Sequence, residues 1–399
     1  MTAATGAAMR RNVRLLSGCF ALSTTSNVIL MSVSALVGYE LAGDKSLATL
    51  PAALMWVGTA AATVPVSFLM RRIGRRLGFM CGALVGMAGA ALGYWAVLSH
   101  DFALFCLAVA VIGAFNGFNF YFRFAGAEVA GEDYRSRAIA LVMAGGVVAA
   151  VIGPELSRAA NDWFLPPAYL GPFVAIAGIA MAIFVFGSFV RIPKPTPVQL
   201  RGGRPLSAIV RQPVFLVAAL SGVVAYGVMI LLMTVTPLAM VMRGHPFDDA
   251  AFVIQWHVLA MFAPSFFSGH LIRRFGVLTV ITWGAVAMLA CIGVAVQGIS
   301  VPHFWLSLIL LGLGWNFLFV GATTLLTEAH TTAERAKTQA LNEFMVFGCA
   351  AVGSYLSGNL HHYLGWEALN LVALPPLLAV LCAAVWLDRR RRRGYAAAE

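Results

Sequence analysis

The stretch from Gly227 to Met261 places sulfur and imidazole side chains at helical spacing among apolar residues. Two pairs are each separated by four residues, so the members of a pair share one face of a helix. The pairs are Met229 with Met233 and His257 with Met261. Thioethers and an imidazole suit a soft cation, Cu(I) above all. The spacing therefore predicts a metal site at these four residues.

The two pairs lie at matched depth if this segment folds as a helical hairpin. With the turn near His245, Met233 and His257 both lie about 18 Å of helix below it. Met229 and Met261 lie about 24 Å below it. These depths fall near the middle of a bilayer, where a histidine is expected to face a cavity or a partner. The alternative is that the methionines only fill apolar gaps.

Other side chains are candidates for roles that accompany the predicted metal site. Met240, Met242 and His245, at the outer end of the hairpin, are candidates for metal entry, with interfacial filler as the alternative. The candidates for coupling or gating are Arg123, Glu128, Glu155, Glu343, Arg71, Arg72, Arg273 and Arg274.

Ionisable residues inside apolar segments are hypotheses for function. Arg123 would repel a cation, so we expect it to pair with Glu128 or to line the cavity in a structural or coupling role. Glu155 and Glu343 are candidates for proton carriage, unless they lie solvated at helix ends. The asparagines are interpreted as interhelical hydrogen-bond partners; they are Asn27, Asn116, Asn119 and Asn316.

The composition places all of these residues in a membrane. The chain has 399 residues, of which 60% are hydrophobic and 11% are charged, and its mean hydropathy is +0.85. A soluble domain is nearer half apolar and a quarter charged. Hydropathy predicts twelve helical spans of about 20 or more residues each. They are 15–38, 46–69, 77–98, 102–127, 137–158, 168–190, 213–242, 248–271, 277–297, 304–328, 338–358 and 366–387.

The basic residues predict the orientation of these spans. With the N-terminus inside, all of the 27 Lys and Arg residues fall in inner segments except Lys45, Arg123, Arg158 and Arg243. This asymmetry predicts a multi-pass protein of the cell inner membrane with both termini in the cytoplasm. The net charge of +11 is scattered over short loops, so we expect no nucleic-acid partner. The lipid bilayer is the expected surrounding, and we expect a monomer.

The chain repeats itself. MRRIG at Met70–Gly74 recurs as IRRFG at Ile272–Gly276, in the loop between the second and third spans of each half. Further matches at one nearly constant offset are Asn116 with Asn316 and Glu128 with Glu328. This pattern predicts duplicated halves. We expect an N-terminal six-helix bundle (1–190), a cytoplasmic linker (191–212), and a C-terminal six-helix bundle (213–399) with the metal-binding motifs and a basic cytoplasmic tail.

The repeated loop resembles that of a known family. SFLMRRIGRR and GHLIRRFG are similar to the signature Gly-x-Leu-x-Asp-Arg-x-Gly-Arg-Arg of the major facilitator superfamily. The resemblance implies an all-α polytopic membrane protein, a rocker-switch transporter with 12 transmembrane helices in 6+6 pseudo-symmetric bundles around a central cavity. The acidic position of the signature is Arg71 in one copy and Arg273 in the other, and its first glycine is Ser67. The usual charge pair of this loop is therefore expected to be altered or absent.

The two methionine-containing motifs resemble those of a narrower group, the CcoA-type copper importers. The resemblance implies that Met229, Met233, His257 and Met261 bind metal. It also implies copper import across the inner membrane for the biogenesis of haem-copper (cytochrome c) oxidase. Copper is then a transported substrate rather than a cofactor, and a cytoplasmic copper chaperone or copper ATPase is the expected downstream partner. Members of this branch that lack the motif are taken to carry other substrates, such as riboflavin.

Two other functions stay open. One is a carrier of an organic solute, by riboflavin-like uptake or by drug efflux; Gly153-Pro154 is similar to the antiporter signature of drug exporters. The other is a non-transporting receptor or assembly factor. The sequence contains no P-loop, Rossmann glycine pattern, nucleophile elbow or HExxH motif. We therefore expect no enzyme and no direct use of ATP, so that transport is secondary.

Overall fold

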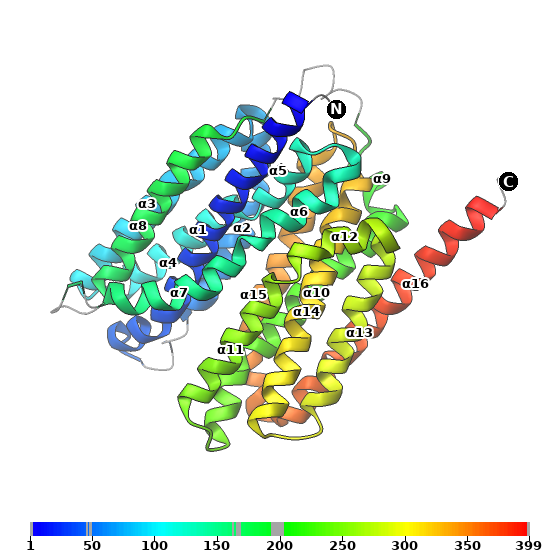
Figure 1. The fold of residues 1–399 in the computed structure, drawn as a ribbon. Helices are drawn as coiled ribbons and strands as arrows, with labels where there is room; N and C mark the ends of the chain where they lie inside the picture. The colour runs from blue at the N-terminus through cyan, green and yellow to red at the C-terminus, as the bar shows by residue number, and fades with distance from the viewer. Residues whose placement is uncertain are drawn as a thin grey trace. The chain divides into compact units, whose positions relative to one another are not determined.

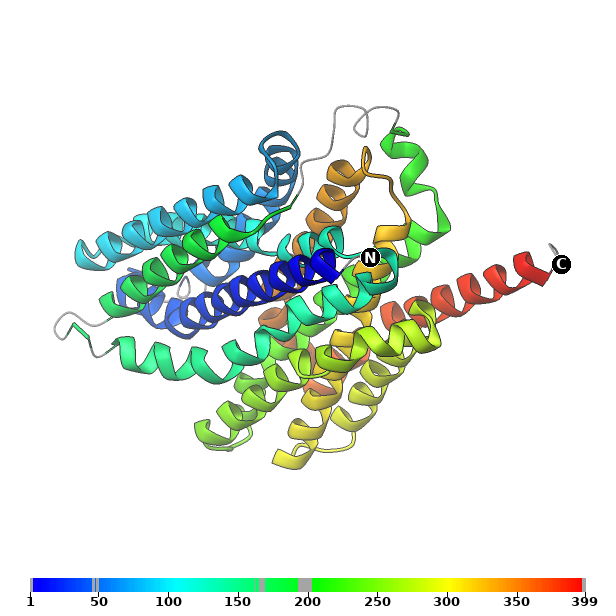
Figure 2. The same cartoon turned by 45° about the horizontal axis from the view of Figure 1, so that its top comes forward.

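The computed structural model describes residues 3–44, 47, 50–161, 163–164, 169–192 and 203–396. Every regular element in these ranges is a helix, and none is a strand (Figures 1 and 2). A helix satisfies its backbone hydrogen bonds within one segment, which a lipid environment requires. The predicted all-α fold class is confirmed.

The helices form two compact units. Unit 1 comprises Met1–Glu132, Leu141–Thr196 and Gln339–Ala351, and unit 2 comprises Asp133–Ala140, Pro197–Thr338 and Val352–Glu399. By their contacts, residues 339–351 belong to unit 1 and residues 133–140 belong to unit 2. Residues 193–202 of that linker lie outside the described ranges.

Unit 1 is a helical bundle. Its helices are α1 (Ala3–Leu41), α2 (Leu50–Ile73), α3 (Arg75–Leu98), α4 (Phe102–Asn119), α5 (Phe122–Val129), α7 (Gly146–Asn161) and α8 (Leu170–Phe189). Helix α4 packs against α2 and α3, and α8 packs against α1 and α3. The start of α1 and the end of α8 lie at the same end of this bundle in both views (Figures 1 and 2). The 3-10 turn Glu132–Tyr134 and α6 (Arg135–Ala144) cross the boundary between the units.

Unit 2 is also helical. Its helices are α9 (Leu206–Val210), α10 (Pro213–Met242), α11 (Phe247–Phe262), α12 (Ser265–Phe275), α13 (Val277–Ala295), α14 (Val301–Glu328) and α16 (Leu374–Ala396). Helix α14 is central, since α10, α11 and α13 all pack against it. Helix α15 (Arg335–Val372) contributes residues to both units.

The predicted count of twelve membrane spans is confirmed only in part. Within the described residues, ten helices have the length and apolar character of a span, and α11 with α12 makes eleven if that bent pair is one span. The pair bends by 41° at Pro264, because proline cannot donate a hydrogen bond to the preceding turn. The predicted span 338–358 in α15 is not among them. Its polar residues Gln339, Asn342 and Glu343 lower its hydropathy.

The sequence repeat corresponds to a structural repeat. Gly74 separates α2 from α3 with φ 90° and ψ 161°, and Gly276 separates α12 from α13 with φ 89° and ψ 152°. Glycine adopts this positive φ readily because it has no Cβ. The last residue of MRRIG and of IRRFG therefore makes the same turn in both units.

A buried carboxylate ties the segment before α9 to the loop between α14 and α15. Glu334 is 1% exposed and accepts hydrogen bonds from Arg204 Nε and Nη2, both at 2.7 Å. It also accepts from the backbone N–H groups of Arg204 at 2.8 Å and Thr331 at 3.0 Å. The hydrogen-bonded Arg204 guanidinium holds the pKa of Glu334 well below its usual range.

Replacing this carboxylate by an amide is expected to remove a pH-dependent part of the stability. Because the pKa of Glu334 is lower in the folded than in the unfolded chain, its contribution is complete above the ordinary carboxyl pKa and is lost as the pH falls. Glu334→Gln should therefore lower the Tm at pH 7, and the deficit should shrink at about pH 3.5. Thermal unfolding in detergent measures both values.

The exposed pair Arg243–Glu367 supplies the control. Glu367 is more than half exposed and its carboxylate lies 3.2 Å from Arg243 Nη2. Exposed ion pairs contribute little to stability, so Glu367→Gln should leave the Tm nearly unchanged at both pH values. Equal deficits for Glu334→Gln at the two pH values would contradict the role of the Glu334 charge.

Candidate functional site

An ion pair is buried inside unit 1. Arg123 Nη2 of α5 lies 2.5 Å from Glu343 Oε2 of α15, and the two side chains are 1% and 0% exposed. Removing two charges from water costs several kcal/mol per ion unless further hydrogen bonds satisfy them. Arg123 and Glu343 are the two coupling candidates that the structure joins directly.

Neighbouring groups satisfy the remaining atoms of the pair. Arg123 Nη1 donates to the Phe120 carbonyl at 2.7 Å, and Asn342 Nδ2 donates to Glu343 Oε1 at 2.8 Å. The guanidinium carbon lies 4.6 Å from the ring centroid of Phe124, within the range of a cation–π interaction. These contacts hold both charged groups in one geometry.

Aromatic rings adjoin the ion pair. Phe347 lies one turn after Glu343 on α15, and its ring centroid is 4.1 Å from that of Phe120. The Trp56 ring of α2 lies 6.3 Å from Phe347 and is nearly parallel to it, at 13°. All three rings are buried. The three rings pack on one another, and the Arg123 guanidinium carbon lies 6.0 Å from the Phe120 ring centroid.

Helices α1 and α4 carry buried amide and hydroxyl groups. Asn116 Nδ2 donates to Asn27 Oδ1, which joins the two helices as the sequence predicts for these residues. Asn116 Oδ1, Asn119 Nδ2 and Ser26 Oγ are buried, and none has a hydrogen-bond partner in the described part of the chain. An unsatisfied buried polar atom costs about 1–3 kcal/mol. A polar ligand that reached these atoms would recover that cost.

The signature loop forms a charge pair through Arg75 and not through Arg71, which occupies the acidic position of the signature. Arg75, the first residue of α3, donates to Glu128 Oε1 from Nη2 at 2.6 Å and from Nε at 3.1 Å. Arg75 Nη2 also donates to Gln339 Oε1 at 2.7 Å. The sequence offered Glu128 as a partner for Arg123, whereas the ion pairs of the structure join Glu128 to Arg75 and Arg123 to Glu343.

The other coupling candidates lie on the surface. Glu155 is 69% exposed and pairs with Arg158 of the same helix at 3.0 Å. The four loop arginines Arg71, Arg72, Arg273 and Arg274 are exposed. The structure brings none of these residues into the buried cluster of unit 1, by which we mean the Arg123–Glu343 pair and the residues that contact it or its aromatic neighbours.

The predicted metal ligands lie on α10 and α11 in unit 2. Met229, His257 and Met261 are buried and Met233 is half-buried. His257 Nδ1 lies 2.8 Å from the Leu308 carbonyl of α14, and since a carbonyl only accepts, Nδ1 carries the proton. His257 Nε2 has no hydrogen-bond partner among the described residues, thioether sulfurs included. The imidazole is thus oriented by α14.

The three metal-entry candidates have different surroundings. Met240 is fully buried, whereas Met242 is 69% exposed. His245 Nε2 lies 2.7 Å from the Ile299 carbonyl, and the imidazole packs edge-on against Phe304. Their role in metal entry stays a prediction.

Sequence reasoning missed several members of the buried cluster in unit 1. Gln339, Asn342 and Phe347 share α15 with Glu343, and Trp56 comes from α2. The polar residues at 339, 342 and 343 follow helical spacing inside an apolar segment, a pattern that indicates one polar face. That signal was present in the sequence. The position of Trp56 beside Phe347 had no local signal.

Comparison with known sequences identifies relatives over the full chain. A family model described as Major Facilitator Superfamily matches residues 15–255 and 247–398. The chain is 41% identical over 401 residues to the riboflavin transporter RfnT of Brucella anthropi, with 100% of both chains covered. It is 30% identical over 377 residues to the uncharacterized MFS-type transporter YdeG of Bacillus subtilis, which covers 89% of this chain and 87% of that protein.

Solved structures share the fold at low sequence identity. The human organic anion transporter MFSD10 (TETRAN) superposes with a TM-score of 0.77 and 14% identity, covering 94% of this chain and 99% of that one. A bacterial homologue of the iron transporter ferroportin in its outward-facing state superposes with a TM-score of 0.73 and 13% identity, covering 95% of this chain and 99% of that one. At such identities the similarity concerns the fold alone.

These comparisons favour the organic-solute alternative over the copper prediction. The resemblance to copper importers rests on four residues, whereas the relation to RfnT extends over the whole chain. None of these relatives supports copper as the cargo, a metal-binding function or a place in cytochrome oxidase biogenesis. The four residues stay a predicted site.

The broader resemblance is confirmed at every level of comparison. The family model covers nearly all of the sequence, two relatives match at 30% identity or more, and the helical fold agrees with solved members. The chain is a multi-pass membrane protein that belongs to the Major Facilitator Superfamily.

Proposed function

We propose that this protein is a secondary transporter of an organic solute of the riboflavin class. The observation that carries the proposal is its 41% identity to the riboflavin transporter RfnT over the full length of both chains. A relation of that extent concerns all helices rather than a single motif. The proposal therefore takes up the organic-solute alternative in place of copper import.

The chemistry of the cluster in unit 1 supports a flat, polar-edged cargo. Ligand sites are mostly apolar, with a few polar groups that orient the ligand. Trp56, Phe120 and Phe347 supply aromatic rings. Asn116 and Asn119 supply amide atoms that have no hydrogen-bond partner among the described residues. A fused heteroaromatic ring with carbonyl and N–H edges, such as that of a flavin, matches this combination.

Glu343 is the proposed carrier of the coupling proton. A carboxylate that accepts a proton becomes neutral, and its attraction to Arg123 is then largely lost. Residues 339–351 of α15 would be held less firmly in unit 1. We further propose a monomer in the cell inner membrane, with both termini in the cytoplasm and 191–212 as a cytoplasmic linker between the bundles.

Uptake of labelled riboflavin tests the proposed function. Bacteria that cannot make riboflavin and lack their own carrier should accumulate it when they express this protein, and cells with an empty vector should not. Uptake of radioactive copper is measured in parallel and should equal that of the empty vector. Copper uptake without riboflavin uptake, at normal protein levels, would overturn the proposal.

Met233→Leu tests whether riboflavin uptake depends on a predicted metal ligand. Leucine is close to methionine in volume, and such swaps usually cost less than about 1.5 kcal/mol. Riboflavin uptake by Met233→Leu should therefore remain near the wild-type rate. His257→Leu is uninformative for this comparison, because it also removes the hydrogen bond to Leu308.

A further inference from the structure

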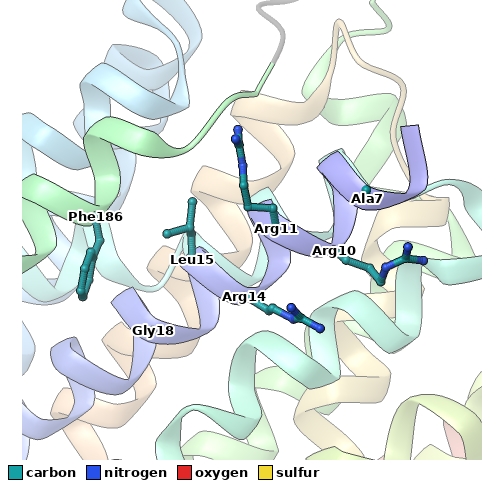
Figure 3. Close-up of a pocket in the computed structure, with 7 residues that line it drawn as sticks. All are labelled: Ala7, Arg10, Arg11, Arg14, Leu15, Gly18 and Phe186. Atoms are coloured by element: carbon teal, nitrogen blue, oxygen red, sulfur yellow. The ribbon is translucent and has the colours of Figure 1, made fainter. Parts of the chain in front are cut away.

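Two adjoining cavities open at the end of unit 1 where α1 begins and α8 ends. The first, of about 470 Å³, is lined by Ala7, Arg10, Arg11, Arg14, Leu15, Gly18 and Phe186 (Figure 3). The second, of about 400 Å³, is lined by Arg11, Leu15, Arg76, Ser188, Phe189 and Arg191. Because Arg11 and Leu15 line both, the cavities share a wall on α1.

The charge of these cavities is uncompensated. Of the residues that the structure describes, five arginines line them and no acidic residue does. Those arginines are Arg10, Arg11, Arg14, Arg76 and Arg191. None of the five makes an ion pair with a carboxylate in the described part of the chain. The site thus presents a concentration of positive charge to an external anion.

The arginines are held by an ordered framework. Arg10 and Arg14 are four residues apart and project to one side of α1, while Arg11 projects to another (Figure 3). Asn12 lies between them and is buried. Its Nδ2 donates to the Arg191 carbonyl at 2.8 Å, and its Oδ1 accepts from the Arg191 N–H at 3.1 Å. These two hydrogen bonds fix the chain after α8 against α1.

The same cavities have an apolar side. Phe186 and Phe189 are exposed on α8, and Leu15 is half-buried on α1. Both helices are long and apolar enough to cross a membrane, and the arginines lie where those spans begin and end. A free anion would use only the arginines. A molecule with an anionic head and apolar chains would use both parts.

The geometry points to a binding site for the phosphodiester headgroup of an anionic phospholipid. The guanidinium groups would hold the phosphate through charge-assisted hydrogen bonds, with the acyl chains along Phe186 and Phe189. Basic pockets between helices at the membrane surface bind such headgroups. This site is independent of the cargo and of the cluster around Arg123.

Binding to the purified full chain in neutral detergent tests this site. Phosphatidylglycerol should bind and raise the Tm, whereas phosphatidylcholine and inorganic phosphate should not. Arg10→Gln/Arg11→Gln/Arg14→Gln should weaken phosphatidylglycerol binding about 100-fold, which corresponds to about 1 kcal/mol per arginine. Phe186→Ala should weaken it as well, because the apolar contact is lost.

A control variant that loses the same number of positive charges elsewhere distinguishes a lipid-binding site from general electrostatic attraction of anionic lipid to the protein. Arg389, Arg390 and Arg393 lie exposed on the last turns of α16, and none of them lines either cavity. Their triple change to Gln should leave phosphatidylglycerol binding intact. An equal loss in this control would overturn the site in favour of bulk electrostatics. A Tm rise with inorganic phosphate equal to that with the lipid would show a free-anion site instead.

Discussion

Arg123→Met is expected to lower the free energy of unfolding by about 3–5 kcal/mol, because it leaves the Glu343 carboxylate buried without its cation. Both side chains are almost fully enclosed, so water cannot replace the missing partner. Thermal unfolding of the purified protein, with the yield of monodisperse material, measures the loss.

The double variant Arg123→Met/Glu343→Leu should recover most of that stability. Replacing a buried ion pair by apolar residues is often neutral or stabilising, since no charge is left to desolvate. Arg158→Met, which breaks the exposed pair with Glu155, should be close to wild type. If the double variant were as unstable as Arg123→Met, the damage would come from packing and not from the unpaired charge.

Transport by the double variant then tests the coupling role of Glu343. The folded protein without the carboxylate should bind the cargo but should not accumulate it against a gradient. Riboflavin uptake at wild-type rates by a stable Arg123→Met/Glu343→Leu protein would remove Glu343 from the transport cycle. It would leave the ion pair with a structural role alone.

Trp56→Leu is expected to raise the KM for riboflavin about 5- to 150-fold. Stacking of a heteroaromatic base on an aromatic side chain contributes about 1–3 kcal/mol, and a flavin ring offers a similar π face. Trp56→Phe keeps an aromatic face beside Phe347 and should lose much less. Initial rates of uptake over a range of riboflavin concentrations, corrected for protein level, give the KM.

The matched control for this substitution lies in the same unit. Trp95 of α3 is 60% exposed, so Trp95→Leu removes an indole that is not part of the buried cluster. Its KM should equal that of the wild type. The same increase in KM for Trp95→Leu and Trp56→Leu would exclude the Trp56–Phe347–Phe120 cluster as the binding surface.

The sequence alone determined the class of protein, its repeat and some local features. Hydropathy and charge asymmetry are sums over neighbouring residues, so they revealed a helical membrane protein without tertiary information. Gly74 and Gly276 marked equivalent turns, because a glycine acts on its own backbone. Arg123 and Glu343 also stood out, since a charge in an apolar segment needs a partner.

Only the tertiary structure decided which of these residues meet. Arg123 and Glu343 are 220 positions apart, and nothing in the spacing of either one identifies the other. Four-residue spacing placed His257 and Met261 on one helix face, but the packing of α11 on α14 directs the imidazole to the Leu308 carbonyl. Helical periodicity specifies a face and not the helix opposite it. Contacts between distant segments depend on how whole helices pack, and this is why residues 339–351 belong to unit 1.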